Sequence, residues 1–417
     1  MTPRAPLDRR GFLAASLAAC AVAGRDSAAA SRPRVLAGVD VVASGASSSL
    51  AGKRVGLLVH AASVDAEGKH SIDALIGAGV KVVRLFGAEH GYRGLAAAGE
   101  KVEDGADATS GLPVVSLYGA KSRPTAGDLE GLDVLAVDMQ DAGVRFYTFA
   151  ATMMHCLEAC AEAGVPMVIL DRPNPLGGQR IEGPVSGPAS EVPRTLVNLT
   201  PGPLVHGLTL GELARFVNAN REKKASLDVI PMKGWSRAMT WSDTGRRWTN
   251  PSPNLRSAEA CLAYPGSCLI EGTTATEGRG TEEPFLLVGA PWLKASEMAR
   301  AVRVRGFSLE PVSFTPRASP SAPAPKHLET PCQGLRIHVT DAHKAVPYRL
   351  GVTLLVEMKR RHREFAWLRD GSGFDRLVGT RTLRAAIDRG DSVDAIVAAD
   401  APDIAAFEQA RKPALLY

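Results

Sequence analysis

Short runs of Val, Leu and Ile alternate with amphipathic stretches between residues 54 and 171. Such runs are typical of strands buried on both faces, and the stretches between them are typical of helices that cover a parallel sheet. The pattern predicts a doubly wound α/β domain with helices on both faces and right-handed crossovers. The expected strands are 55–59, 80–86, 113–117, 133–138 and 166–170, and the expected helices are 71–78, 125–132 and 146–163.

The regular alternation ends after residue 171. Residues 172–208 are rich in Pro and Gly and are expected to be irregular. A helix is expected at 209–220, where Thr209 is a candidate N-cap and Glu212, three residues later, completes a capping box. A further strand is expected at 227–232.

The composition shifts near residue 290. The Pro-, Ala- and Ser-rich segment 316–325 is expected to be exposed. After it the sequence predicts a strand at 334–340, a helix at 348–361 and two shorter helices. We therefore expect one domain over 35–290 and a smaller α+β domain over 291–417.

The N-terminus has the pattern of an export signal. A twin-arginine sequence, Arg9-Arg10-Gly11-Phe12-Leu13, precedes an apolar run that is too short to cross a bilayer and suits a signal peptide. Two endings remain open: a lipobox that would leave Cys20 lipidated, and a cut after Ala30. We expect residues 1–30 to be a signal peptide and the protein to be exported, either to the periplasm or lipid-anchored to a bacterial membrane facing it. No later run reaches the length of a membrane span.

Charge and motifs argue against several partners and cofactors. The formal charge of +5 is dispersed over short basic runs, with no nucleic-acid-binding motif beside them. No phosphate-binding glycine motif follows the first expected strand, so the parallel sheet does not imply a nucleotide cofactor. The histidine spacing matches no zinc-binding helix pattern, and no metal site is expected.

The cysteines favour buried thiols over a disulfide framework. If Cys20 belongs to the signal, five remain, and an odd number argues against full pairing. A Cys156–Cys160 link or a Cys261–Cys268 pair is the alternative in an oxidising compartment.

Polar residues follow three of the expected strands. Glu89 and His90 follow 80–86, Asp138, Gln140 and Asp141 follow 133–138, and Asn174 lies shortly after 166–170. Ligands of doubly wound sheets bind outside the carboxyl ends of the strands. The sequence therefore predicts one shared site rather than scattered polar loops.

Glu89 is the leading candidate for chemistry. A carboxyl at the mouth of a sheet, partly shielded from water, can stay protonated and serve as general acid for a glycosidic oxygen. Asp138 and Gln140 point the same way from a strand and together suit sugar hydroxyls. The plainer interpretations are a helix cap or salt bridge for Glu89, and a helix cap for Asp138 or Asp141.

Other side chains are candidates for binding. Arg145 can grip a carboxylate through two hydrogen bonds, and Tyr147 can stack on a sugar ring. Arg279 lies between glycines in a loop that also carries Glu271 and Glu277. Proline-flanked Asn174 and Asn254 sit on rigid backbone. A structural role for the arginine and tyrosine, a solvated loop and plain turns are the alternatives.

Several long motifs occur in order along the chain: Phe86-Gly-Ala-Glu-His-Gly-Tyr-Arg93-Gly, Gly99-Glu-Lys-Val102, Asp138-Met-Gln-Asp-Ala-Gly-Val-Arg-Phe-Tyr147, Asp171-Arg-Pro-Asn-Pro175, Pro251-Ser-Pro-Asn254, Tyr264-Pro-Gly-Ser-Cys268 and Glu271-Gly-Thr-Thr-Ala-Thr-Glu-Gly-Arg-Gly280. Over about residues 35–417 they resemble the NamZ/YbbC-like exo-β-N-acetylmuramidase family. The resemblance implies a Rossmann-like domain, a smaller C-terminal domain, a cleft between them and no required cofactor. One departure is Ala88, where Pro is common before the Glu.

The resemblance also implies roles for particular residues. It makes Glu89 the proposed catalytic acid and places a further set at the cleft, consisting of His90, Asp138, Gln140, Arg145, Tyr147, Asn254, Glu277 and Arg279. Arg93, Asn174 and Glu271, which lie in the same motifs, are counted among the substrate-binding residues. Arg145 or Arg279 would suit the lactyl carboxylate of the sugar.

The resulting hypothesis is an exo-acting glycoside hydrolase that releases N-acetylmuramic acid from the non-reducing end of peptidoglycan fragments. Its second carboxyl is Asp138 or Glu277, and retention, inversion and substrate assistance all remain open. The alternatives are a non-catalytic lipoprotein that binds wall sugars, and a metal-dependent hydrolase using Asp138, Asp141 and His90.

Overall fold

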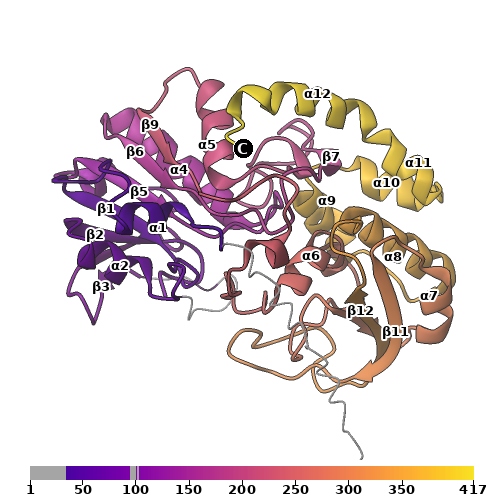
Figure 1. Ribbon diagram of the computed structural model, residues 1–417. Helices are drawn as coiled ribbons and strands as arrows, with labels where there is room; N and C mark the ends of the chain where they lie inside the picture. Colours follow the sequence, from indigo (N-terminus) through magenta and orange to yellow (C-terminus); the bar gives the residue numbers. More distant parts are fainter. Residues whose placement is uncertain (1–33, 94–99, 101–102) are drawn as a thin grey trace, which may run out of the picture. The chain divides into compact units, whose positions relative to one another are not determined.

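A seven-stranded sheet organises the first part of the chain (Figure 1). Its spatial order is β3-β4-β2-β1-β5-β6-β9, in which β3 runs antiparallel to β4 and the other neighbours are parallel. The strands are β1 (Val55–Val59), β2 (Val82–Gly87), β3 (Gly105–Ala106), β4 (Pro113–Ser116), β5 (Val134–Asp138), β6 (Met167–Leu170) and β9 (Leu227–Ile230). The strand order reverses between β1 and β5, as in a doubly wound sheet.

The computed structural model describes residues 34–93, 100 and 103–417. The expected signal peptide, the twin-arginine pattern and the lipidation site Cys20 lie outside the described residues. So does most of the motif at 99–102.

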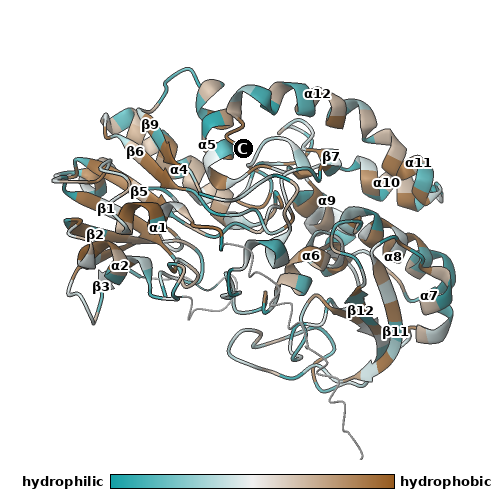
Figure 2. Ribbon diagram, in the orientation of Figure 1, coloured by the Kyte–Doolittle hydropathy of each residue, from teal (hydrophilic) through white to brown (hydrophobic). Residues whose placement is uncertain are grey.

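Helices cover both faces of the sheet, as the sequence predicted. Along β5, Val134 and Ala136 join one hydrophobic cluster, while Leu135 and Val137 join the other, because successive side chains of a strand point to opposite faces. The first cluster includes residues of α1 (Gly38–Ala43) and α2 (Ser71–Gly77). The second includes residues of α3 (Ala126–Leu129), α4 (Thr148–Ala163) and α5 (Leu210–Ala219). Figure 2 shows the apolar strands between these layers.

The expected capping box at the start of α5 is confirmed. The Glu212 amide donates to the Thr209 hydroxyl at 3.2 Å, and the Thr209 amide donates to the Glu212 carboxylate at 3.0 Å. In the preceding segment the prediction of irregular structure was partly wrong. Two short strands there, β7 (Glu182–Val185) and β8 (Pro203–Val205), pair antiparallel although they are 17 residues apart in the chain.

The second part of the chain is built on a three-stranded antiparallel sheet in the order β10-β12-β11. The strands are β10 (Leu287–Ala290), β11 (Phe307–Phe314) and β12 (Cys332–Val339), of which only β12 was expected. Helices α6 (Ala258–Ser267), α7 (Ala295–Ala301) and α8 (Pro347–Arg361) pack beside it. A β-carbon on Gly351 would lie 2.6 Å from the Gly266 carbonyl oxygen, so α6 and α8 touch backbone to backbone. The domain boundary expected after residue 290 stays a prediction.

One expectation about the C-terminal region was wrong, and another held only in part. Four α-helices follow α8 among the described residues, rather than two: α9 (Ser372–Val378), α10 (Thr382–Arg389), α11 (Val393–Ala399) and α12 (Ala401–Arg411). The segment 316–325 is not uniformly exposed, since Pro316, Ala322 and Pro325 are buried. It is held against the glycine-rich loop, where the Arg317 amide donates to the Gly280 carbonyl at 2.8 Å. No helix in the described part of the chain combines the length and apolar character needed to cross a bilayer.

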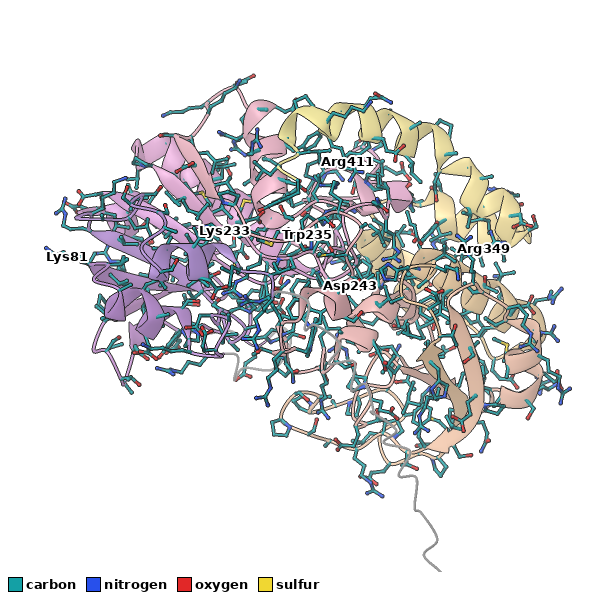
Figure 3. All side chains as sticks on the ribbon, viewed as in Figure 1. Lys81, Lys233, Trp235, Asp243, Arg349 and Arg411 are labelled. Atoms are coloured by element: carbon teal, nitrogen blue, oxygen red, sulfur yellow. The ribbon has the colours of Figure 1, made fainter. Side chains whose placement is uncertain are left out.

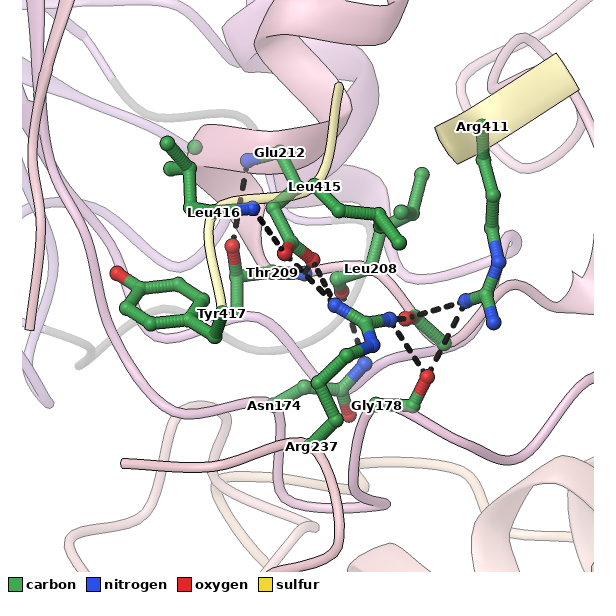
Figure 4. Close-up of polar contacts among 12 residues, drawn as sticks. Asn174, Gly178, Leu208, Thr209, Glu212, Arg237, Arg411, Leu415, Leu416 and Tyr417 are labelled. Carbon is green, nitrogen blue, oxygen red and sulfur yellow. Dashed lines mark hydrogen bonds and ion pairs between the residues drawn. The ribbon is translucent and has the colours of Figure 1, made fainter. Parts of the chain in front are cut away.

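The C-terminal residues are anchored to α5 (Figure 4) and to the end of β6. The Leu416 amide donates to Glu212 at 2.9 Å, and the Tyr417 hydroxyl donates to Asp171 at 2.8 Å. The Tyr417 ring packs edge-on against Trp235, which Figure 3 labels, with centroids 5.0 Å apart. The last residue thereby ties the C-terminal helices to the seven-stranded sheet.

Asp171 at this anchor predicts a pH effect on stability. Burial raises the pKa of Asp171 to about 6, although Thr209, Gly211 and Tyr417 donate hydrogen bonds to it. The pKa of Asp171 is higher in the folded protein than in the unfolded chain, so the folded state favours the protonated carboxyl. Its contribution to the free energy of unfolding is therefore full at low pH and is lost as the pH rises through about 6. The shift from 3.8 to about 6 corresponds to on the order of 3 kcal/mol.

We expect Asp171→Asn to unfold with a melting temperature that changes less between about pH 4 and about pH 7 than that of the wild type. The measurement is thermal unfolding across this range. Asp394→Asn is the matched control, because that side chain is 83% exposed. Parallel pH profiles for wild type and Asp171→Asn would contradict the prediction.

Candidate active site

A cavity of about 540 Å³ lies where the carboxyl ends of β2, β4 and β5 face loops from the second part of the chain. Its size falls within the range of roughly 300–1,000 Å³ common for ligand sites. It lies to one side of the switch point between β1 and β5. The crevice at the switch point is occupied by the fully buried His60. The ring of His60 accepts a hydrogen bond from the Gln140 backbone amide at 2.8 Å and packs against Phe149.

Glu89 reaches the cavity from a tight turn after β2. Ala88 is buried, His90 adopts a φ of 69°, and the Gly91 amide closes the turn on the Ala88 carbonyl at 2.9 Å. A left-handed backbone at a non-glycine residue is uncommon and is concentrated at functional sites. The Thr148 hydroxyl, on the first residue of α4, donates to the Glu89 carboxyl at 2.6 Å. Glu89 and His90 both line the cavity.

Three phenol groups, those of Tyr118, Tyr147 and Tyr264, line the same cavity as this carboxyl. Burial, followed by the charge of Glu89, raises the pKa of Tyr118. Burial likewise raises the pKa of Tyr147 and Tyr264 well above the ordinary value, so all three remain neutral hydrogen-bonding groups. Tyr147 packs against Phe149 with ring centroids 4.8 Å apart, and Tyr264 packs against Phe285 at 4.6 Å. The cavity therefore offers aromatic surface together with hydroxyls, a combination suited to a sugar.

A charged cluster also borders the cavity. Arg279 lies 2.6 Å from Glu271 and 3.2 Å from Glu277, and Lys326 lies 3.0 Å from Glu277. Burial alone would lower the pKa of Arg279, but the two carboxylates raise it overall. Burial would raise the pKa of Glu277, but Lys326 and Arg279 lower it overall. Glu271 and Arg279 line the cavity, whereas Glu277 lies behind them, bound to both cations.

Asp138 and Gln140 do not face the cavity. Asp138 is fully buried, and the Arg172 guanidinium donates to both of its oxygens, at 2.7 Å for the Nη2 contact. The side-chain amide nitrogen of Gln140 donates to the backbone carbonyls of Asp141 and Pro173. The expectation that strand alternation would present both groups to a ligand is thus not met, because the β6 end supplies Arg172 directly beside Asp138.

Four other candidates hold loops instead of lining the cavity. Arg145 is fully buried and donates to the Pro184, Gly202 and Val378 carbonyls, and burial lowers its pKa to about 9. Asn174 donates to the Leu208 carbonyl and Asn254 to the Ser321 carbonyl, each at 2.8 Å. Arg93 pairs with Asp107.

The structure therefore brings together five of the predicted site residues: Glu89, His90, Tyr147, Glu271 and Arg279. Sequence reasoning missed several lining residues, among them Tyr118, Thr195, Ser252, Tyr264 and Arg376. Tyr118 follows β4, so the strand-end rule could have found it. Arg376 and Thr195 come from segments without a local signal, and only packing identifies them.

The donors proposed for a metal do not converge. Within the described residues, no three His, Cys, Asp or Glu side chains form a group that could hold a metal ion. Asp138 pairs with Arg172, and Asp141 accepts the Gly143 amide at 2.7 Å. The five described cysteines are each buried and free, so neither of the possible disulfides forms.

Comparisons with known proteins cover nearly the whole described chain. Residues 55–259 match the family model for the N-terminal part of exo-beta-N-acetylmuramidase NamZ, and residues 262–417 match the model for its C-terminal part. The chain is 39% identical over 393 residues to peptidoglycan beta-N-acetylmuramidase NamZ of Bacillus subtilis, covering 93% of this chain and 92% of that protein. Crystal structures of two DUF1343 family proteins from Bacteroides fragilis are similar, with TM-scores of 0.82 and 0.74 at 30% and 32% identity. Each similarity covers 92% of this chain and 99% of the other.

Proposed function

The chain belongs to the exo-β-N-acetylmuramidase NamZ family, and from this membership we propose that it is a glycosidase that releases N-acetylmuramic acid from the non-reducing end of peptidoglycan fragments. The observation that carries the proposal is the placement of Glu89. Its carboxyl lines a cavity walled by aromatic rings and phenols, and Thr148 fixes one of its oxygens.

Glu89 acts as the general acid. Cleavage of a glycosidic bond requires a proton on the leaving oxygen as the bond to the sugar breaks. The hydrogen bond from Thr148 orients the carboxyl. Neutral Tyr118, Tyr147 and Tyr264 can donate to or accept from sugar hydroxyls at neutral pH, because burial keeps them protonated.

Glu271 replaces Asp138 and Glu277 as the favoured second carboxylate. Asp138 is bound to Arg172 away from the cavity, and Glu277 is bound to Arg279 and Lys326. Glu271 lines the same cavity as Glu89 and is held through Arg279. We therefore propose Glu271 as the second carboxylate of the reaction.

The direct test is product release. We expect the protein to liberate free N-acetylmuramic acid from a disaccharide that carries this sugar at its non-reducing end, and to leave the reverse disaccharide, which begins with N-acetylglucosamine, intact. Chelator should not change the rate. Binding without release would favour the wall-sugar-binding alternative, and loss of activity with chelator would favour the metal-dependent one.

We also propose export as the address of the enzyme. The support is the twin-arginine pattern and the two processing endings at Cys20 and Ala30. Export would place the enzyme in the periplasm, or on a lipid anchor facing it, where its peptidoglycan-derived substrate is formed.

A further inference from the structure

Two guanidinium groups line the cavity, and they differ in their surroundings. Arg279 is compensated by Glu271 and Glu277, which occupy its Nε and Nη2 atoms. Arg376 also lines the cavity, but it belongs to α9, which is far from Arg279 along the sequence. In the part of the chain that the structure describes, no carboxylate lies within ion-pair distance of Arg376. The cavity thus contains one compensated arginine and one uncompensated arginine.

The position of Arg376 is set by rigid packing of α9. Phe374 and Val378, on either side of it, are fully buried. A β-carbon on Gly272 would lie 2.6 Å from Phe374, so α9 is packed closely against the loop that carries Glu271. Asp375 binds Arg384 through two contacts of 2.8 Å. The buried Arg145 donates to the Val378 carbonyl at the end of the helix. These contacts fix the backbone while the Arg376 side chain remains exposed.

We propose that Arg376 binds the lactyl carboxylate of the terminal N-acetylmuramic acid and distinguishes it from N-acetylglucosamine. The inference rests on the proposed function, because the lactyl group is what separates the two sugars. Its carboxylate is the only charge on that sugar, and a planar guanidinium binds a carboxylate through two parallel hydrogen bonds. Arg376 can form them without displacing an internal partner.

The two arginines favoured by sequence reasoning are less suited to this role. Arg145 is fully buried and its donors are directed to backbone carbonyls. Arg279 already holds two carboxylates, and a third would face their repulsion. Arg145 instead acts as a positioning residue, because it holds the end of the helix that presents Arg376.

The test compares two substrates of nearly equal size: 4-nitrophenyl β-N-acetylmuramide and the same compound with its lactyl carboxylate converted to the neutral amide. For the wild type we expect kcat/KM to favour the carboxylate by about ten- to a hundredfold, as for a charge-assisted contact. In Arg376→Met this ratio should fall to about one, and Arg376→Lys should restore part of it. Added salt should lower the wild-type ratio and leave that of Arg376→Met unchanged, because an exposed pair is screened.

Arg381→Met is the matched control. Arg381 is exposed and lines a neighbouring cavity of about 410 Å³. Thr195 and Arg376 line both this cavity and the one that contains Glu89, whereas Arg381 does not line the latter. We expect this variant to keep the wild-type ratio. A ratio that stays at the wild-type value in Arg376→Met, whether or not both rates fall, would overturn the proposal. Failure of the proposed function would look different, since the wild type would then hydrolyse neither substrate.

Discussion

Glu89→Gln is expected to keep the fold and to lower turnover of the natural disaccharide by about a thousandfold or more. The amide preserves the size of the side chain, and its oxygen can still accept the Thr148 hydroxyl. It cannot deliver a proton to the leaving oxygen. The measurement is kcat for release of N-acetylmuramic acid, with circular dichroism and melting temperature to verify folding.

Two substrates sharpen this experiment. A nitrophenolate leaves readily without protonation, whereas the hydroxyl of the next sugar is a poor leaving group that needs the acid. We therefore expect a smaller loss on the nitrophenyl substrate than on the disaccharide. Glu282→Gln is the control, because this carboxyl is 97% exposed and lies outside the cavity. Wild-type turnover of the disaccharide by Glu89→Gln would end the assignment of Glu89 as the acid.

Arg172→Met is expected to destabilise the protein by about 3–5 kcal/mol, because it leaves the fully buried Asp138 carboxylate without its cation. Asp138 lies at the end of β5 and Arg172 just beyond β6, so the pair joins two neighbouring strands of the sheet. The measurement is the denaturant midpoint and melting temperature. For comparison, Arg317→Met removes an exposed pair with Glu329 and should change stability by less than about 1 kcal/mol.

A double variant separates structure from catalysis at Asp138. Replacing both partners, as Asp138→Leu with Arg172→Met, removes the uncompensated charge and should recover much of the lost stability. If Asp138 serves the fold alone, the folded double variant should retain turnover. A stable but inactive double variant would return Asp138 to the catalytic candidates. An Arg172→Met protein as stable as the wild type would show that the Asp138–Arg172 pair does not stabilise the fold.

Local patterns predicted most of the seven-stranded sheet. The five strands expected up to residue 171 and the one at 227–232 are all present, with ends shifted by at most about two residues. Aliphatic runs buried on both faces and the capping box at Thr209 act over a few residues, so the sequence shows them directly. The strands missed in the second part, β10 and β11, depend on pairing with β12 over gaps that carry no local signal.

The site was predicted less completely. The strand-end rule located Glu89 and His90, and glycine spacing located the loop of Glu271 and Arg279. The same rule placed Asp138 and Gln140 at a site that they do not reach, because it identifies which end of a sheet binds ligands but not which crevice is open. His60, Arg172 and Gln140 fill the space at the switch point, and this is a matter of packing between distant segments.

The sequence by itself determined the doubly wound sheet, the family and the position of the Glu89 carboxyl just after β2, since each of these depends on contiguous residues. Only the tertiary structure decided which polar side chains are used for the fold and which face the cavity. Whether a buried arginine or aspartate finds a partner depends on segments far apart in the chain, as with Arg145 and Val378. For the same reason Arg376 became a candidate only once α9 was seen to bring it to the cavity that contains Glu89.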